Sequence, residues 1–227
     1  KLYLGEFLMK KCAIILSGCG VYDGSEIHES CLLTYFLDLH EISITFLAPN
    51  INQTDCIDHN IGKPMEKNTR NCLVESARIA RGNITELKTA NVDSFDFAIF
   101  PGGYGAAKNL STFATENENL TINKDVETFI LSMNKLNKPL GFICISPVIA
   151  AKLFPKVRCT LGLDQENLNM LTKIGATATQ ANYDDVVIDS EFKIFSTPAY
   201  MVTESISKVG VGIKKLVDTM LSSISDT

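Results

Sequence analysis

The chain alternates between short runs of consecutive apolar residues and segments in which apolar residues recur every three or four positions. Short uninterrupted apolar runs are typical of strands buried on both faces, and the longer period is typical of amphipathic helices. Strands are predicted at 12–17, 42–47, 97–100 and 139–145, and helices at 71–81, 125–134, 148–153 and 205–222, with an earlier helix that ends near His40. Strands that alternate with helices indicate parallel strands joined by crossovers. The pattern therefore predicts an α/β fold, a three-layer sandwich around a mainly parallel sheet.

The first predicted helix carries polar residues that could do chemistry near its start. Asp23 and Glu26 have the spacing of a capping box. The apolar residues expected to form its buried stripe are Leu32, Tyr35, Phe36 and Leu39. Relative to that stripe, Glu29 lies at the edge, His28 nearer the middle and Glu26 further toward solvent. Helical periodicity leaves the choice between His28 and Glu29 as a catalytic base open.

The rest of the chain adds a long connection and a hairpin. Residues 51–69 are polar and contain Gly62 and Pro64, and connections of this length are often functional or mobile. The apolar segments 186–188 and 193–195 flank a polar turn and predict a hairpin. No repeat or linker divides the sequence. Residues 9–227 are therefore predicted to form a single domain, and residues 1–8 an upstream extension or remnant outside it.

Composition and charge narrow the class of protein. Of 227 residues, 45% are hydrophobic and 21% charged, which is typical of a globular chain and excludes disordered, fibrous and membrane classes. The net charge of −5 lacks the excess of Lys and Arg that would neutralise a phosphate backbone, so a nucleic acid is not an expected partner. The segment Lys1 to Lys10 lacks the apolar core of a secretory signal.

The cysteines indicate a reducing compartment. Seven are scattered along the chain, an odd number with no C-x-x-C, and the three histidines match no zinc-site spacing. Together with the absence of a targeting signal, this pattern predicts a cytoplasmic location, no membrane partner and no structural metal.

Cys144 is the candidate nucleophile. Ligands of open α/β sheets bind beyond the carboxyl ends of the strands, so the loops at 18–24, 101–105 and 144–147 are expected to meet in one crevice. Cys144 lies in the last loop, at a junction of strand and helix, where the helix dipole is expected to lower the thiol pKa. The alternative is a buried structural cysteine, which is the interpretation favoured for the other six.

The glycine-rich loop 101–105 is a candidate oxyanion hole. Without a Cβ, Gly102 and Gly103 let backbone N–H groups approach a ligand closely. The donors would be the N–H groups of Gly103 and Ile145, the residue after the nucleophile. A plain tight turn is the alternative, and a phosphate cradle is disfavoured because the Walker spacing is absent. No histidine follows Cys144, which excludes a glutamine amidotransferase triad in the order Cys, His, acid.

Five segments together resemble one known family, and the resemblance extends from Met9 to about Ser222. The segments are Leu16–Glu29, Thr69–Gly82, Phe100–Leu110, Lys138–Pro147 and Thr197–Met201. They are similar to the enhancing-lycopene-biosynthesis (ElbB) family of the PfpI-like, class I glutamine amidotransferase-like superfamily. The resemblance implies a flavodoxin-like sandwich, a homodimer, a nucleophile at Cys144, a glutamate at Glu29 and an oxyanion loop at Gly102 and Gly103.

The implied activity is a weak, cofactor-free glyoxalase that converts glyoxal and water into glycolate, or one face of a broader deglycase activity, with a link to isoprenoid metabolism. The substrate would be a small reactive aldehyde. The chain lacks the histidine that superfamily peptidases and deglycases carry shortly after the cysteine, which argues against peptidase action. The alternative function is a redox-sensing or regulatory small-molecule-binding protein that uses the same cysteine without turnover.

Overall fold

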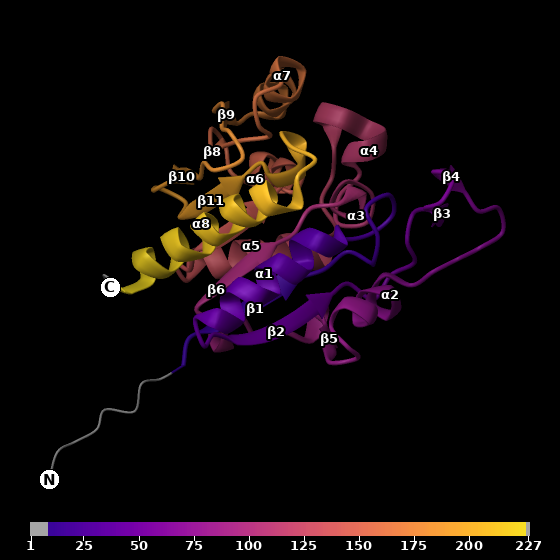
Figure 1. Cartoon of the computed structure of the whole chain (residues 1–227), viewed down its shortest axis with the longest axis horizontal. Helices are drawn as coiled ribbons and strands as arrows, with labels where there is room; N and C mark the ends of the chain where they lie inside the picture. Colours follow the sequence, from indigo (N-terminus) through magenta and orange to yellow (C-terminus); the bar gives the residue numbers. More distant parts are fainter. Residues whose placement is uncertain (1–8, 226–227) are drawn as a thin grey trace, which may run out of the picture.

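A computed structural model describes residues 9–225, in which seven strands form one sheet in the order β10-β11-β7-β6-β1-β2-β5 (Figure 1). The strands are β1 (Lys11–Ile15), β2 (Ser43–Ala48), β5 (Ile84–Glu86), β6 (Phe97–Phe100), β7 (Leu140–Ile143), β10 (Val187–Asp189) and β11 (Ile194–Thr197). All neighbouring pairs are parallel except β10 with β11. The predicted mainly parallel α/β sheet is confirmed, and residues 1–8, predicted as an extension, lie outside the described residues.

Helices cover both faces of the sheet. They are α1 (Ile27–Leu39), α2 (Cys72–Ile79), α3 (Tyr104–Lys108), α4 (Phe113–Glu116), α5 (Lys124–Lys135), α6 (Pro147–Leu153), α7 (Gln165–Ile174) and α8 (Ile206–Ser225). Figure 1 shows α1 and α8 side by side across one face. Helices α5 and α6 pack on the opposite face, which completes the three layers.

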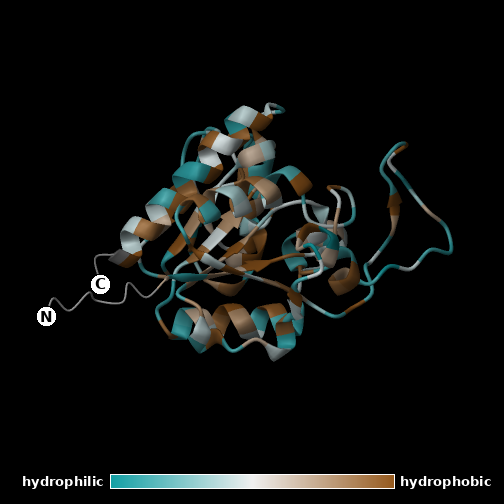
Figure 2. Cartoon of the chain, turned by 60° about the horizontal axis from the view of Figure 1, so that its bottom comes forward, coloured by the Kyte–Doolittle hydropathy of each residue, from teal (hydrophilic) through white to brown (hydrophobic). Residues whose placement is uncertain are grey.

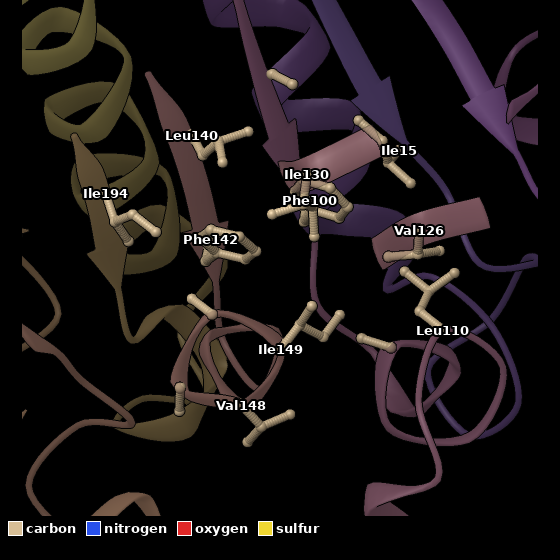
Figure 3. Packing of buried hydrophobic residues seen from close by; sticks show 14 of the residues in the cluster. Ile15, Phe100, Leu110, Val126, Ile130, Leu140, Phe142, Val148, Ile149 and Ile194 are labelled. Carbon is tan, nitrogen blue, oxygen red and sulfur yellow. The ribbon is translucent and has the colours of Figure 1, made fainter. Parts of the chain in front are cut away.

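The alternating side chains of the central strand explain why its sequence is apolar throughout. Cys12 and Ile14 face the cluster under α1 and α8, whereas Ala13 and Ile15 face the cluster under α5 and α6. Figure 3 shows the second cluster, where Ile15 lies among side chains from β6, β7 and α5. A strand buried on both faces has no position where a polar side chain would be solvated.

The remaining elements are short. They are β3 (Ile57–Asp58), β4 (Lys63–Pro64), β8 (Arg158–Cys159), β9 (Thr177–Ala178) and the 3-10 turns η1 (Leu87–Thr89), η2 (Val92–Ser94), η3 (Asn117–Asn119) and η4 (Ala199–Met201). Strands β3 and β4 form a hairpin within the predicted long connection, and Figure 2 shows it extending away from the sheet and helices. The predicted hairpin at 186–195 is confirmed as the antiparallel pair β10 and β11.

The predicted buried face of α1 is wrong by about one residue. Leu33 and Leu37 are fully buried, whereas Tyr35 and Leu39 are more than half exposed. The capping box is also wrong, because Glu26 is the N-cap and its own carboxylate accepts the Glu29 N–H at 2.7 Å. Asp23 instead accepts the N–H of Ile57 from the long connection at 2.7 Å. Helix α1 packs against the sheet and, alongside, against α8, so two surfaces rather than one decide which residues are covered.

Candidate active site

The three loops predicted to meet do so at the carboxyl ends of β1, β6 and β7. The N–H of Glu26 donates to Gly102 O at 2.9 Å, and the N–H of Tyr104 donates to Val21 O at 2.7 Å. These bonds join the loop after β1 to the loop after β6. Because the three strands are parallel neighbours, their ends open at the same edge of the sheet.

Cys144 occupies a tight elbow between β7 and α6. Its φ of 61° is in the left-handed region that non-glycine residues rarely adopt, and strain of this kind costs on the order of 1–3 kcal/mol. The Cys144 N–H donates to Thr197 O at 3.0 Å, and the Ser146 hydroxyl donates to Phe100 O at 2.9 Å. Ser146 occupies the second position after the cysteine, where the motif of other nucleophile elbows has a glycine. Its hydrogen bond to Phe100 O links the turn to the end of β6.

Glu29 reaches the cysteine from α1 and is fully buried. The Gly102 N–H donates to its Oε2 at 2.8 Å, whereas Oε1 has no hydrogen-bond partner among the described residues. Burial is the main cause that raises the pKa of Glu29 to about 8, and the nearby Glu26 adds to it. The Gly102 N–H and the Cys144 thiol oppose this rise because they stabilise the carboxylate.

The thiol of Cys144 has a raised pKa, which corrects the expectation of a lowered one. Burial is the largest cause, and the charge of Glu29 is the second. The N–H groups of Gly103 and Ile145 point to the sulfur and favour the thiolate, as a donor pair for an oxyanion would, but they do not outweigh burial. At neutral pH the Cys144–Glu29 pair thus holds both protons, and loss of one gives a single shared anion.

The structure separates the two candidate bases. The His28 side chain is 56% exposed and its Nδ1 lies 2.7 Å from the Tyr200 hydroxyl, so the expectation that it lies nearer the middle of the buried stripe is wrong. Glu29, expected at the edge, is the buried residue in contact with Cys144. Glu26, expected to point to solvent, is also buried because it caps α1.

A pocket with a volume of about 360 Å³ opens over the cysteine. Its lining residues are Val21, Gly103, Tyr104, Phe113, Cys144, Ile145, Asn167, Tyr200 and Met201. The sequence-based reasoning assigned no role to most of these. Tyr200 and Met201 follow β11, so the rule that ligands bind beyond strand ends could have identified them. Asn167 is on α7, a helix that the sequence analysis did not predict, and no pattern in the sequence indicated it.

The other cysteines are less uniform than predicted. Four of the six are buried, as expected, but Cys19 is half-buried and Cys31 is exposed on α1. Cys144 remains the cysteine that combines an elbow, a carboxylate neighbour and two converging N–H groups.

Within residues 9–225, no group of three or more His, Cys, Asp or Glu side chains is arranged to hold a metal ion. No helix in this part of the chain is long and apolar enough to cross a membrane.

The candidate oxyanion loop requires glycine at position 103. Gly103 has a φ of 90°, and a Cβ there would lie 2.3 Å from Gly24 O and 2.4 Å from Glu26 N. We expect Gly103→Ala to lower the free energy of unfolding by roughly 3–5 kcal/mol, because backbone atoms cannot move aside cheaply. Gly82→Ala is the matched control, since Gly82 has a φ of 83° with no atom within 4 Å of its Cβ position. Its expected cost is about 1–2 kcal/mol, and equal urea midpoints for the two variants would contradict the crowding.

Burial of Glu29 makes stability depend on pH. In the unfolded chain its carboxyl ionises near 4.5, but in the folded chain its pKa is about 8. Between these values the unfolded state loses a proton that the folded state keeps, so the free energy of unfolding falls as pH rises. The difference in unfolding free energy, wild type minus Glu29→Gln, should fall by up to about 4 kcal/mol from pH 5 to pH 8 in urea titrations. A pH-independent difference would show that Glu29 ionises normally.

The chain is similar in sequence to several known proteins. No family model matches the sequence. The chain is 40% identical over 220 residues to the mitochondrial ES1 protein homolog of Rattus norvegicus, covering 93% of this chain and 83% of that protein. It is 39% identical to the human mitochondrial glutamine amidotransferase-like class 1 domain-containing protein 3, covering 93% and 82% of the two chains. It is 31% identical to the mitochondrial ES1 protein of Danio rerio, covering 83% and 76%.

Solved structures of related proteins have a similar fold. An isoprenoid biosynthesis protein with an amidotransferase-like domain from Ehrlichia chaffeensis is 36% identical, with a TM-score of 0.87 over 94% of this chain and 99% of that one. A DJ-1 superfamily protein from Salmonella typhimurium shares the fold, with a TM-score of 0.55 and 18% identity over 96% and 90% of the chains. The predicted flavodoxin-like, class I glutamine amidotransferase-like fold is thereby confirmed.

The prediction of a cytoplasmic location is wrong in the light of these relatives. All three curated relatives are named as mitochondrial proteins. The prediction rested on the scattered free cysteines and on the absence of a targeting signal. Free cysteines indicate only a reducing environment, which does not distinguish the cytosol from other compartments.

Proposed function

Since this chain belongs to the family of ES1 and glutamine amidotransferase-like class 1 domain-containing proteins, we propose that it is a cofactor-independent, glyoxalase-like enzyme that converts glyoxal and water into glycolate. One observation carries the proposal. The buried carboxyl of Glu29 contacts the Cys144 thiol, and the N–H groups of Gly103 and Ile145 converge on the same sulfur. A nucleophile, a proton carrier and two oxyanion donors therefore surround one point.

In the first step, Cys144 adds to one aldehyde carbon of glyoxal. In the form of the Cys144–Glu29 pair that has lost one proton, the Sγ–C bond forms, the thiol proton passes to the Glu29 carboxylate, and Glu29 returns it to the new alkoxide oxygen. The N–H groups of Gly103 and Ile145 stabilise the negative charge on that oxygen before it is protonated. Because the pKa of Glu29 is about 8, its carboxyl can both accept and release a proton near neutral pH.

In the second step, the carbon bound to sulfur is oxidised and its neighbour is reduced. Glu29 removes the proton from the sulfur-bearing carbon and delivers it to the other carbonyl carbon, while the hydroxyl proton moves to the second oxygen. The product is a thioester of glycolate on Cys144, and no external oxidant or reductant is needed. Water then cleaves the S–C bond, which releases glycolate and restores the thiol.

Glutamine hydrolysis is a weaker candidate for this site. A triad of the amidotransferase type requires a histidine that orients and relays protons to the leaving ammonia. Among the described residues, the pocket lining contains no histidine, and His28 bonds to Tyr200 rather than to Cys144.

The experiment that tests the proposal follows purified protein with glyoxal and with methylglyoxal by NMR. We expect glycolate and lactate, and we expect intact-mass spectra of acid-quenched samples to show one aldehyde added at Cys144. Neither product nor adduct would overturn the proposal. Reversible oxidation of Cys144 without turnover would instead favour a redox-sensing or regulatory binding protein.

We also propose that the protein forms a homodimer, on the family resemblance. Apolar side chains that remain exposed on α1 and α8, among them Leu39 and Val211, are compatible with a symmetric interface. Sedimentation at micromolar concentration should give a species of two chain masses. A species of one chain mass, 24.9 kDa, would refute the assembly.

A link to isoprenoid metabolism is proposed on the relatives alone. The Ehrlichia chaffeensis protein is described as an isoprenoid biosynthesis protein, and its fold and sequence are similar to those of this chain. Unchanged isoprenoid levels in cells that lack the protein would count against the link.

A further inference from the structure

The pocket over Cys144 is larger and more apolar than glyoxal requires. Its volume of about 360 Å³ falls within the range of roughly 300–1,000 Å³ that is typical of small-molecule pockets. Glyoxal has four heavy atoms, each of which is polar or bound to a polar atom, so it would leave most of this space unfilled. Apolar space beside a nucleophile is best used by a substrate with an apolar substituent, since burial of that substituent contributes binding energy.

The walls of the pocket consist of apolar and aromatic side chains from four parts of the fold. Val21 follows β1, Phe113 begins α4, and Met201 follows β11. Tyr104 and Tyr200 add two aromatic side chains to the lining, and aromatic rings pack favourably against an aromatic group.

The pocket has little to attract an anion. Its lining contains no Lys, Arg or His among the described residues. Lys108 lies near the wall, with Nζ 5.8 Å from the Tyr104 ring centre, but this ammonium donates to Asp55 Oδ2 at 2.8 Å and to Tyr22 O at 2.9 Å. Burial is the main cause of the raised pKa of Tyr200, and the nearby carboxyls of Glu26 and Glu29 add to it. A carboxylate or phosphate on the substrate would enter this largely apolar lining without a compensating cation.

Asn167 supplies the one side-chain amide in the lining. It is half-buried on α7, and its own N–H belongs to the cap of that helix, where it donates to Asp164 Oδ1 at 2.9 Å. A neutral amide can bond a carbonyl or hydroxyl of a substrate without demanding a charge.

From this lining we propose that the site takes neutral α-oxo aldehydes with an apolar or aromatic substituent, for which phenylglyoxal is the simplest aromatic probe, and discriminates against anionic aldehydes. The inference rests on the proposed function and names its substrate class. Glyoxal then reacts with the catalytic groups but does not fill the pocket, so it is expected to be turned over less efficiently than such a substrate.

The reaction of such a substrate balances in the same way as that of glyoxal. The aldehyde R–CO–CHO adds Cys144 Sγ at its aldehyde carbon, the C–H proton moves through Glu29 to the ketone carbon, and the hydroxyl proton moves to the ketone oxygen. The resulting thioester, R–CHOH–CO–S, takes up water, and the S–C bond breaks. The product is R–CHOH–COOH, and phenylglyoxal gives mandelate.

The first test compares kcat/KM for phenylglyoxal and glyoxal, with Cys144→Ala as the blank for uncatalysed loss. We expect kcat/KM to be at least about tenfold higher for phenylglyoxal, because differences in apolar contact of this size give discrimination of that order. Equal or lower values for phenylglyoxal, with glyoxal turned over, would overturn the substrate class and leave the proposed function intact. Turnover of neither aldehyde would overturn the proposed function.

The second test does not depend on turnover. Rates of alkylation at Cys144 are measured with iodoacetamide, iodoacetate and phenacyl bromide, each divided by its rate with glutathione. Iodoacetate and iodoacetamide have nearly the same size and differ in charge, so their normalised ratio reports charge selection by the pocket. We expect iodoacetate to be disfavoured and phenacyl bromide favoured, each by about tenfold. Equal normalised rates would overturn the inference even if the protein has no turnover.

A pair of variants checks that the lining sets this selectivity. Asn167→Lys places a cation in the pocket and should raise the normalised iodoacetate rate several-fold. Asn169→Lys puts the same residue on the same helix at an exposed position outside the lining, and should leave that rate unchanged. Equal rates in the two variants would show that charge in the pocket does not control access to Cys144.

Discussion

Replacing Cys144 with Ala should reduce glyoxal turnover to the uncatalysed rate, a loss of roughly four orders of magnitude or more. Without the sulfur no hemithioacetal or thioester forms, and the N–H groups of Gly103 and Ile145 have no bound intermediate to stabilise. The fold should survive, because Ala fits within the volume of Cys and the main-chain bond from residue 144 to Thr197 O is kept. The measurement is glycolate formation by NMR, with circular dichroism to establish folding.

Cys31→Ala is the matched control for this variant. Cys31 is exposed on the same helix as Glu29 and does not line the pocket, so its removal should leave turnover within about twofold of wild type. Wild-type turnover in Cys144→Ala would show that glyoxal reacts elsewhere, and a large loss in Cys31→Ala would place that reaction on α1.

Glu29→Gln should lower glyoxal turnover by about 10²–10⁴-fold, because a neutral amide cannot accept the thiol proton or carry it between the two carbons. The same change should make Cys144 react faster with iodoacetamide above about pH 8, where Glu29 of the wild type is ionised. The charge of Glu29 is one cause of the raised thiol pKa, so its removal lowers that pKa. Opposite effects on turnover and on alkylation separate loss of a proton carrier from general damage to the site.

His28→Gln is the comparison for this variant. The exposed imidazole contacts the Tyr200 hydroxyl and does not contact Cys144 among the described interactions, so turnover should change by no more than a few-fold. If His28→Gln abolished turnover and Glu29→Gln retained it, the assignment of the proton carrier to Glu29 would be wrong.

The sequence by itself determined the layers of the fold and the place in the fold of the candidate nucleophile, Cys144. Consecutive apolar residues at 12–16 and 97–100 are typical of strands covered on both faces, and the structure has β1 and β6 there. Parallel strands bring their following loops to one edge, so Cys144, Gly102 and Gly103 were predicted to meet. They do meet, because this prediction depends on chain direction and strand order rather than on the packing of any single side chain.

The tertiary structure decided which acid faces the cysteine and how both groups ionise. The buried face of α1 is set by contact with the sheet and, alongside, with α8, and a period of 3.6 residues cannot resolve a shift of one residue. That shift buries Glu29 and exposes His28. It also reverses the expected pKa of Cys144, since desolvation depends on everything packed around a group, whereas the helix dipole follows from local sequence.

The pocket lining depended on the tertiary structure for the same reason. Val21, Phe113, Asn167 and Tyr200 come from segments far apart in the chain, and each is unremarkable in its local sequence. Local pattern fixes an element and its direction because the interactions that define it act within a few residues. The volume and polarity of a pocket are instead sums over side chains that only the packed chain brings together.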